Sequence, residues 1–283
     1  MIAFWAYACY CGFSLTLSLL WIGSLLWSII RFRIRQTQLI SACKEGNVEK
    51  IKQLLTKSYV DPNCRNEYWN DGKTLLCLAC ENREIEIVKI LLNDWRVNVK
   101  KTNVDGRTPL LIACEKGHTE GVELLLSDQR VEINKTNQNG ETPLFISCSK
   151  GYFEIVELLL NDQRVDINKA RKDDRTPFDI ACFNGHIEIV KLLLASERYI
   201  YFNLKAALKI SNQRSTSAGK YRSETEQEYQ NAKKNCPKIV ELLESYQRNL
   251  NETKSKLREE LKYCKIFFIF FSFSSLFTNE KKR

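Results

Sequence analysis

The feature that most constrains the fold is a 34-residue repeat in the middle of the chain. Four segments align without gaps, and they begin at Asp71, Asp105, Asn139 and Asp173. Three of them open with Asp-Gly or Asn-Gly, a tight-turn signal whose residues tolerate a positive φ. Internal periods of about 20 to 50 residues are typical of arrays in which each unit contacts only its neighbours. We therefore expect a solenoid rather than a single globular core.

Each copy predicts two short helices. In the third copy Thr142 would cap the first helix and Pro143 would occupy its first position. Gly151 would end that helix in the left-handed conformation, and a second helix would follow over residues 154–160. Helices this short are not stable alone in water. Their apolar faces must therefore be buried against neighbouring repeats, and a weaker partial copy precedes the four around residues 41–47.

These residues resemble the ankyrin repeat. The second full copy contains Gly-Arg-Thr-Pro-Leu at 106–110, Ala-Cys at 113–114, Gly-His at 117–118 and Val-Glu-Leu-Leu-Leu at 122–126. The resemblance extends over about residues 37–205. It implies an all-α dominated repeat solenoid of helix-turn-helix units joined by projecting β-hairpin loops.

Several positions depart from the family pattern. The His that follows Thr-Pro-Leu in the family is absent from all four copies. Arg83 stands where other copies have a helix-ending Gly, and Asp174 stands at the Gly of the turn. Gly121 interrupts a second helix, at a cost of about 1 kcal/mol in helix propensity. These changes weaken single repeats without threatening the fold.

The array is expected to span residues 36–210, with a partial cap at 36–69 and repeats near 71–104, 105–138, 139–172 and 173–205. Residues 36–200 carry 23 Lys and Arg against 25 Asp and Glu, so this part is almost neutral. Nucleic-acid binding needs clustered Lys and Arg. We therefore expect no nucleic-acid partner for the array.

Residues 1–35 form a hydrophobic segment with a basic flank. Residues 2–30 contain no charged side chain, and about 20 apolar residues span the hydrocarbon core of a bilayer. Arg31, Arg33 and Arg35 follow at once, and positive charges favour the cytosolic side. This pattern predicts a single-pass transmembrane anchor with the repeats facing the cytosol. A cleaved signal peptide and secretion are the alternative, although such peptides usually begin with basic residues.

The carboxy-terminal part divides into three. The polar residues 211–236 predict a disordered insertion. Residues 237–263 predict the second helix of a terminal repeat and then a polar helix. The Phe-rich tail, 264–283, has an apolar core of twelve residues, which is too short to span a bilayer as a helix. A membrane-interface segment, a second span and a sequence not under selection remain open for this tail.

The residues with reactive side chains indicate packing rather than chemistry. Five cysteines share one position in the first helices, where a small buried residue fits between repeats: Cys43, Cys80, Cys114, Cys148 and Cys182. Cys77 and Cys80 resemble half of a zinc site, but a second pair at suitable spacing is missing. His118 and His186 recur at one repeat position and predict structural hydrogen bonds. We expect no enzyme, no cofactor and no metal.

Arginines also recur every 34 residues, in the loops after the second helices. In three copies an aspartate precedes the arginine by two residues: Asp94 and Arg96, Asp128 and Arg130, Asp162 and Arg164. The fourth arginine is Arg198. The spacing predicts local loop-stabilising pairs. A stripe that binds an acidic partner is the alternative.

The resemblance implies that the turn tips and the inner sides of the first helices bind a protein partner. We expect the array to be monomeric. Carried over position by position, the expected contacts are Asn70, Asp71, Lys73, Glu81, Asn82, Val104, Asp105, Arg107, Glu115, Lys116, Gln138, Asn139, Glu141, Ser149, Lys150, Lys172, Asp173, Arg175, Phe183 and Asn184. Phe183 is the apolar member of this set that would suit the centre of an interface. Packing of Phe183 under the neighbouring insertion is the alternative.

The sequence therefore predicts a membrane-tethered ankyrin repeat scaffold that binds an unidentified protein and does not catalyse a reaction. A secreted effector that binds host proteins through the same repeats is one alternative. An accessory subunit that targets an enzyme is the other.

Overall fold

The computed structural model describes residues 26–27, 30–57, 60–65, 72–196, 204–216 and 225–261. The chain divides into two compact units, residues 1–105 and 106–283, and each is described by itself. The Phe-rich tail at 264–283 lies outside the described residues, as do residues 1–25 of the predicted anchor.

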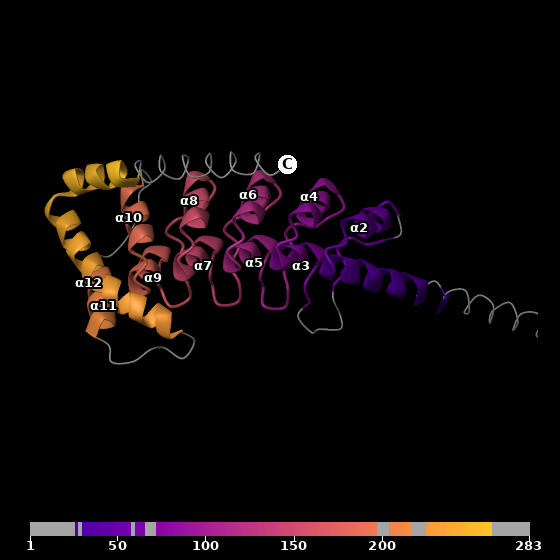
Figure 1. Cartoon of the computed structure of the whole chain (residues 1–283), viewed down its shortest axis with the longest axis horizontal. Coiled ribbons are helices and arrows are strands. Elements are labelled where there is room, and N and C mark those ends of the chain that lie inside the picture. Colours follow the sequence, from indigo (N-terminus) through magenta and orange to yellow (C-terminus); the bar gives the residue numbers. More distant parts are fainter. Residues whose placement is uncertain are drawn as a thin grey trace, which may run out of the picture. The chain divides into compact units, whose positions relative to one another are not determined.

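The described residues fold into pairs of short helices (Figure 1). In the first unit residues 26–27 and 30–44 are helical, and α2, Val48–Leu55, α3, Leu75–Asn82, and α4, Ile85–Asn93, follow. The second unit contains α5, Pro109–Glu115, α6, Thr119–Ser127, α7, Pro143–Lys150, α8, Phe153–Asn161, α9, Pro177–Phe183, α10, Ile187–Ala195, α11, Leu204–Thr216, and α12, Glu226–Arg248. Residues 250–261 form a last helix.

The predicted capping residues start the first helices. The Thr142 hydroxyl accepts a hydrogen bond from the Phe145 backbone N–H at 3.1 Å, and Pro143 occupies the first turn of α7. Thr74, Thr108 and Thr176 cap α3, α5 and α9 in the same way. Because each cap satisfies an N–H group that the helix leaves without a partner, the short helices begin at fixed positions in every repeat.

The repeats of the second unit stack in two layers. The first helices α5, α7, α9 and α11 pack side by side in that order, and so do the second helices α6, α8, α10 and α12. The repeated cysteines lie between the first helices and are fully buried, as predicted for Cys114, Cys148 and Cys182. The apolar core is therefore a continuous seam that each repeat shares with its neighbours.

The loops between repeats differ from the expected β-hairpins. The described residues contain no strand, and one isolated antiparallel bridge joins Arg65 and Thr74. The turn of the third copy is closed by two backbone hydrogen bonds, from Asn137 N–H to Glu141 C=O at 3.1 Å and from Gly140 N–H to Asn137 C=O at 3.0 Å. This turn is therefore tight, and its two backbone hydrogen bonds do not extend into a strand ladder.

The packing of His118 explains why a glycine stands at position 121, inside α6. A Cβ atom on Gly121 would lie 2.6 Å from Nδ1 of His118, whose side chain is buried. A Cβ atom does not approach another heavy atom this closely without a shift of one of them. The glycine therefore makes room for the imidazole, and its cost in helix propensity is the cost of that packing.

The expectation of a disordered insertion over residues 211–236 is wrong for its two ends. Residues 211–216 belong to α11, and α12 begins at Glu226 behind a capping box formed by Thr225 and Glu228. Residues 217–224 lie outside the described part of the chain. The helix forms because it has a buried face, which consists of Tyr229, Ala232, Cys236, Ile239 and Leu243. The terminal repeat therefore has a second helix that starts about three turns before the predicted one.

The last helix closes the end of the second unit. Leu257 is buried, and the Arg258 guanidinium donates a hydrogen bond to the Ala195 carbonyl at the end of α10, at 3.1 Å. Lys191 of α10 pairs with Glu260 at 3.2 Å. These contacts add a polar cover to α10 beside the terminal repeat formed by α11 and α12, and polar ends are typical of such arrays.

The recurring arginines form the predicted local pairs with aspartate, and two of them also bond to the preceding repeat. Arg164 pairs with Asp162 at 2.7 Å and also donates to the Leu126 carbonyl near the end of α6, at 2.5 Å. Arg96 makes the equivalent bond to the Leu55 carbonyl at the end of α2. Arg198 lies outside the described residues. Because carbonyls in the last turn of a helix have no partner within it, each of these arginines caps the preceding repeat.

No helix within the described ranges is both long enough and apolar enough to cross a membrane. The predicted anchor falls mostly on residues that the structure does not describe, so it stays a prediction.

Candidate partner-binding groove

Two positions of each repeat face each other on the inner side, which we define as the side of the turn tips and first helices. One position follows the turn, and the other lies eight residues later in the first helix. Lys73 and Glu81 occupy these positions in the first full copy, and their charged groups are 2.7 Å apart. Arg107 and Glu115 form the same pair in the second copy at 2.8 Å. These two copies therefore close their inner side with an ion pair.

The last two copies replace this ion pair. In the third copy the positions hold Glu141 and Ser149, and Glu141 instead pairs with Arg171 of the following turn at 3.3 Å. In the fourth copy Arg175 lies over the ring of Phe183, with its guanidinium carbon 5.1 Å from the ring centre. The third and fourth copies therefore lack the ion pair between these two positions.

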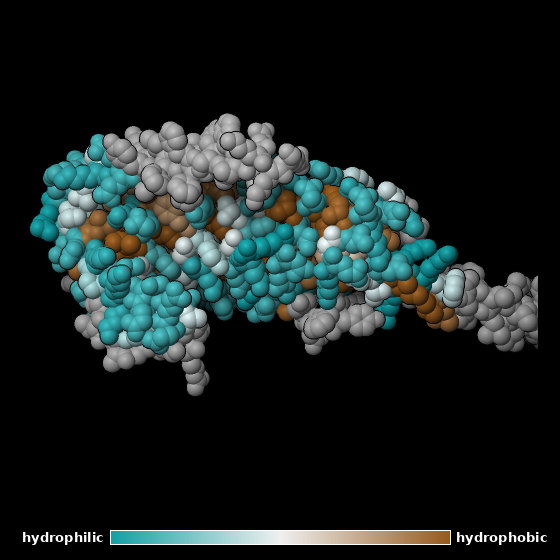
Figure 2. Space-filling model, in the orientation of Figure 1, coloured by the Kyte–Doolittle hydropathy of each residue, from teal (hydrophilic) through white to brown (hydrophobic). Residues whose placement is uncertain are grey.

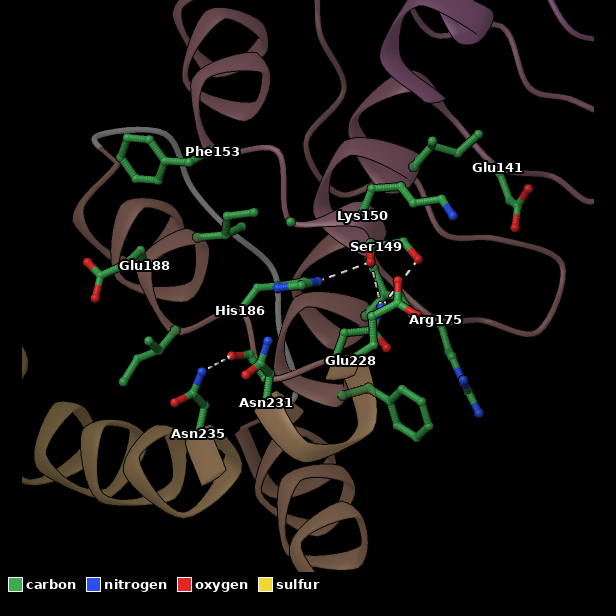
Figure 3. Close-up of a pocket in the computed structure, with 18 of the residues that line it drawn as sticks. Glu141, Ser149, Lys150, Phe153, Arg175, His186, Glu188, Glu228, Asn231 and Asn235 are labelled. Carbon is green, nitrogen blue, oxygen red and sulfur yellow. Dashed lines mark hydrogen bonds between the residues drawn. The ribbon is translucent and has the colours of Figure 1, made fainter. Parts of the chain in front are cut away.

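A groove of about 810 Å³ lies at this place in the second unit. Helices α7 and α9, the turns before them and α12 supply most of its lining. From α12 come Glu228, Asn231 and Asn235, which Figure 3 shows together with His186 and Ser149 around the groove. The terminal repeat therefore adds a polar wall to the inner side of the array.

The floor of the groove is fixed by hydrogen bonds to one carbonyl. The Ser149 C=O accepts a hydrogen bond from Nδ2 of Asn184 at 2.7 Å and lies 3.1 Å from Nε2 of His186. Nε2 must carry a proton in this pair because a carbonyl only accepts. Beneath the ring is Gly151, at a φ of 79°. A Cβ atom there would lie 2.6 Å from Cε1 of His186, so this ring position requires glycine.

The groove holds charges of both signs. Lys150, Arg171 and Arg175 supply three positive charges, and Glu115, Glu141, Glu188 and Glu228 supply four negative ones. Hydrogen bonds from the Thr225 backbone and hydroxyl lower the pKa of Glu228, and nearby Lys150 adds to this effect. Burial lowers the pKa of His186, so the imidazole favours its neutral form. The positive and negative charges that a ligand would meet in the groove are therefore nearly equal in number.

Phe183 packs against the terminal repeat instead of standing alone. The buried guanidinium of Arg214, on α11, lies 5.0 Å from the Phe183 ring centre and 5.3 Å from that of Tyr229 on α12. Arg175 covers Phe183 from another direction. A cation over an aromatic face is attracted by the ring. Phe183 is therefore a half-buried part of the groove wall, as the alternative interpretation proposed.

The predicted contact residues fall into three groups. Seven of them line the groove: Glu115, Glu141, Ser149, Lys150, Arg175, Phe183 and Asn184. Six others of the second unit lie outside its lining: Arg107, Lys116, Gln138, Asn139, Lys172 and Asp173. In the first unit are Lys73, Glu81, Asn82, Val104 and Asp105, whereas Asn70 and Asp71 lie outside the described residues.

The α12 residues and His186 were missing from the predicted contacts. A signal for α12 was available, because its buried residues are spaced three and four apart from Tyr229 to Leu243. That spacing predicts one apolar helix face. It was hidden by a polar composition typical of a disordered segment.

The cysteines of the first helices are buried thiols and do not form a site. Burial raises the pKa of Cys43 and Cys114 to about 12. Within the described part of the chain, no cluster of three or more His, Cys, Asp or Glu side chains could hold a metal ion. The half zinc site suggested by Cys77 and Cys80 has buried thiols at both positions.

A comparison with known protein families matches ankyrin repeats (3 copies) over residues 39–137 and 129–206. The chain belongs to the ankyrin repeat family. A search of curated proteins found no match. Ankyrin repeats generally mediate binding between proteins, and the family is typically non-catalytic.

Proposed function

We propose that this ankyrin repeat protein is a membrane-tethered scaffold whose groove holds an extended segment of a partner protein. The observation that carries the proposal is the 810 Å³ groove at α7, α9 and α12, where the ion pair that closes the first two copies is replaced. The nearly balanced charge of its lining disfavours nucleic acid, whose binding needs clustered Lys and Arg.

The groove chemistry fits a polypeptide. Asn231 and Asn235 from α12 and Asn184, which follows α9, supply side-chain amides to the lining. The amide nitrogens of Asn184 and Asn235 already donate to the Ser149 and Gly185 carbonyls, and their amide oxygens can accept further hydrogen bonds. A peptide backbone has the complementary donor and acceptor groups. Lys150 of α7 and Glu228 of α12 both line the groove and would favour a segment that carries charges of both signs.

Site-specific photo-cross-linking in cells tests the groove. A cross-linker is placed at Lys150 in the groove and, as a control, at exposed Glu123 of α6, which does not line it. We expect a discrete protein adduct from position 150 alone. Asn231→Arg should abolish the adduct by filling the groove, whereas Gln230→Arg on the neighbouring exposed position should leave it. Equal adducts at both cross-linker positions, or equal effects of both arginine variants, would refute binding in the groove.

The tether is tested separately. The uncharged residues 2–30 and the arginines after them support a membrane anchor. The chain should stay in the membrane pellet after washing with alkaline carbonate, and a tag on its carboxy terminus should be cleaved by protease added on the cytosolic side. Release into the carbonate wash, or protection of the tag inside vesicles, contradicts the tether.

A further inference from the structure

Exposed apolar side chains are concentrated at the start of the first unit. Among the described residues, eight large hydrophobic side chains are exposed, and five of them fall within ten positions: Leu26, Trp27, Ile30, Phe32 and Ile34. Figure 2 shows brown atoms on this end of the helix, which Figure 1 draws in dark indigo. Single exposed apolar residues are normal on a protein surface, but a cluster marks an interaction site.

Four of the five share one side of the helix. Residues 26–27 and 30–44 are helical, and at helical spacing Leu26, Ile30 and Ile34, which are four residues apart, fall in a stripe along one face with Trp27 beside them. Arg31 and Arg33 flank this stripe, and the segment from Leu26 to Arg35 contains three arginines and no acidic residue. An apolar face bordered by arginines is typical of a helix that lies at a membrane surface.

The stripe points away from the repeat array. The face that packs into the first repeat contains Gln36, Leu39 and Cys43, all buried, and Phe32 lies one turn earlier on that same face. On the stripe side the helix continues through Gln38, which is exposed. Within the described residues of the first unit, Ile30 and Ile34 are therefore left uncovered.

We infer that the helical residues 26–27 and 30–35 lie at the interface of a bilayer that contains anionic lipids, with the stripe of Leu26, Trp27, Ile30 and Ile34 facing the acyl chains. This inference rests on the proposed tether and adds the lipid class and the face that contacts it. The uncharged residues 1–25 lead directly into the stripe. The charge complementarity is with phosphate-bearing headgroups, to which arginines near an anionic membrane surface are attracted.

One helix carries both the stripe and the first buried residues of the array. Ile34 and Leu39 are separated by little more than one helical turn, or roughly 8 Å along the axis. The first repeat would therefore be held close to the headgroups and in a fixed rotation, since a helix transmits rotation that a flexible linker would lose. The bilayer would meet the side of the helix that is opposite the array.

Fluorescence quenching measures which face meets the lipid. The full chain is reconstituted with Trp5, Trp21, Trp69 and Trp95 replaced by Phe, so that Trp27 is the reporter. Bilayers contain phosphatidylcholine brominated on the acyl chains with about 30% phosphatidylserine, an anionic lipid. The matched control, Trp27→Phe with Phe32→Trp, moves the reporter to the other face at a position of similar exposure, 48% against 64%.

We expect the emission of Trp27 to fall by about half and that of the control by about a tenth, because only the apolar face of an interfacial helix enters the acyl region. Arg31→Gln with Arg33→Gln should reduce the fraction of bound helix, by about fivefold in its equilibrium constant for each arginine. The reduction should vanish in bilayers of phosphatidylcholine alone.

The outcomes separate this inference from the tether. No quenching of either reporter in a chain that resists carbonate extraction overturns the inference and leaves the tether. Equal strong quenching of both also overturns it, because the segment would then be immersed in the hydrocarbon as part of a span. Quenching of Trp27 alone in a chain that carbonate releases supports the inference and refutes the tether.

Discussion

The substitution Gly151→Ala tests how closely neighbouring repeats pack at the groove. Alanine at a φ of 79° adopts the left-handed conformation, which costs about 1–2 kcal/mol for a residue with a Cβ atom. The new Cβ would also lie 2.6 Å from Cε1 of His186. The ring must then move, and the loss of its hydrogen bond to the Ser149 carbonyl adds about 1 kcal/mol. The expected destabilisation is about 2–3 kcal/mol.

Urea unfolding followed by far-UV circular dichroism measures this loss. Position 83 provides the control, because Arg83 ends α3 in the left-handed conformation at a φ of 62°. The difference in stability between Arg83→Ala and Arg83→Gly gives the backbone cost of alanine alone. A double-mutant cycle of Gly151→Ala with His186→Ala isolates the ring displacement.

Gly151→Ala should lower the free energy of unfolding by more than the backbone cost of alanine measured at position 83. It also predicts a coupling of about 1 kcal/mol with His186→Ala, because the alanine has no ring to displace. A loss equal to the backbone term alone, together with zero coupling, would show that the ring adapts freely. The conclusion that this ring position requires glycine would then be incorrect.

Three further predictions concern other parts of the second unit. Burial lowers the pKa of His186 below its ordinary value of 6.5. The unfolded chain therefore takes up the proton first, and the free energy of unfolding should fall as pH drops below about 6.5. His186→Gln should remove this part of the pH dependence of the free energy of unfolding, measured by urea titrations from pH 7 to pH 5. Burial raises the pKa of Cys114 to about 12 and also that of Cys148, so at pH 8 a thiol reagent should label these residues only as fast as the array opens, and rapid labelling of the native chain would contradict their burial. Arg164→Ala removes the bond to the Leu126 carbonyl and should cost about 1 kcal/mol, whereas Asp162→Asn, which keeps that bond, should cost less; equal losses would mean that the local pair is the main contribution.

The sequence was sufficient to predict the repeats because their signals are local. Thr142, Pro143 and Gly151 determine where α7 begins and ends, and these effects depend on residues within one turn. The same applies to Arg83, which was recognised as standing at a glycine position and has a positive φ.

The groove was predictable only in part because it depends on contacts between distant segments. Asn235 of α12 donates to the Gly185 carbonyl at 3.0 Å, across fifty residues. No local pattern indicates which repeat a terminal helix will contact. The role of Arg164 was missed for the same reason, since its partner Leu126 belongs to the preceding repeat.

The polar composition of residues 226–235 concealed a helix with one buried face. Tyr229 and Ala232 are the buried residues there, and two such residues among ten leave the segment polar in composition. Periodicity over a longer stretch, which includes Cys236 and Ile239, would have indicated the helix.

The bonds from arginines to carbonyls bear on how such an array changes its length during evolution. Arg164 of one repeat donates to the Leu126 carbonyl of the repeat before it. A duplicated internal repeat would carry an arginine that caps the repeat before it. It would also carry the helix-end carbonyls that the arginine of the next repeat caps. Such a duplication could be inserted without leaving an open helix end. At the last full repeat the cap of the Ala195 carbonyl comes from Arg258, more than sixty residues away. Growth of this chain by duplication is therefore favoured within the array and disfavoured at its carboxy-terminal end.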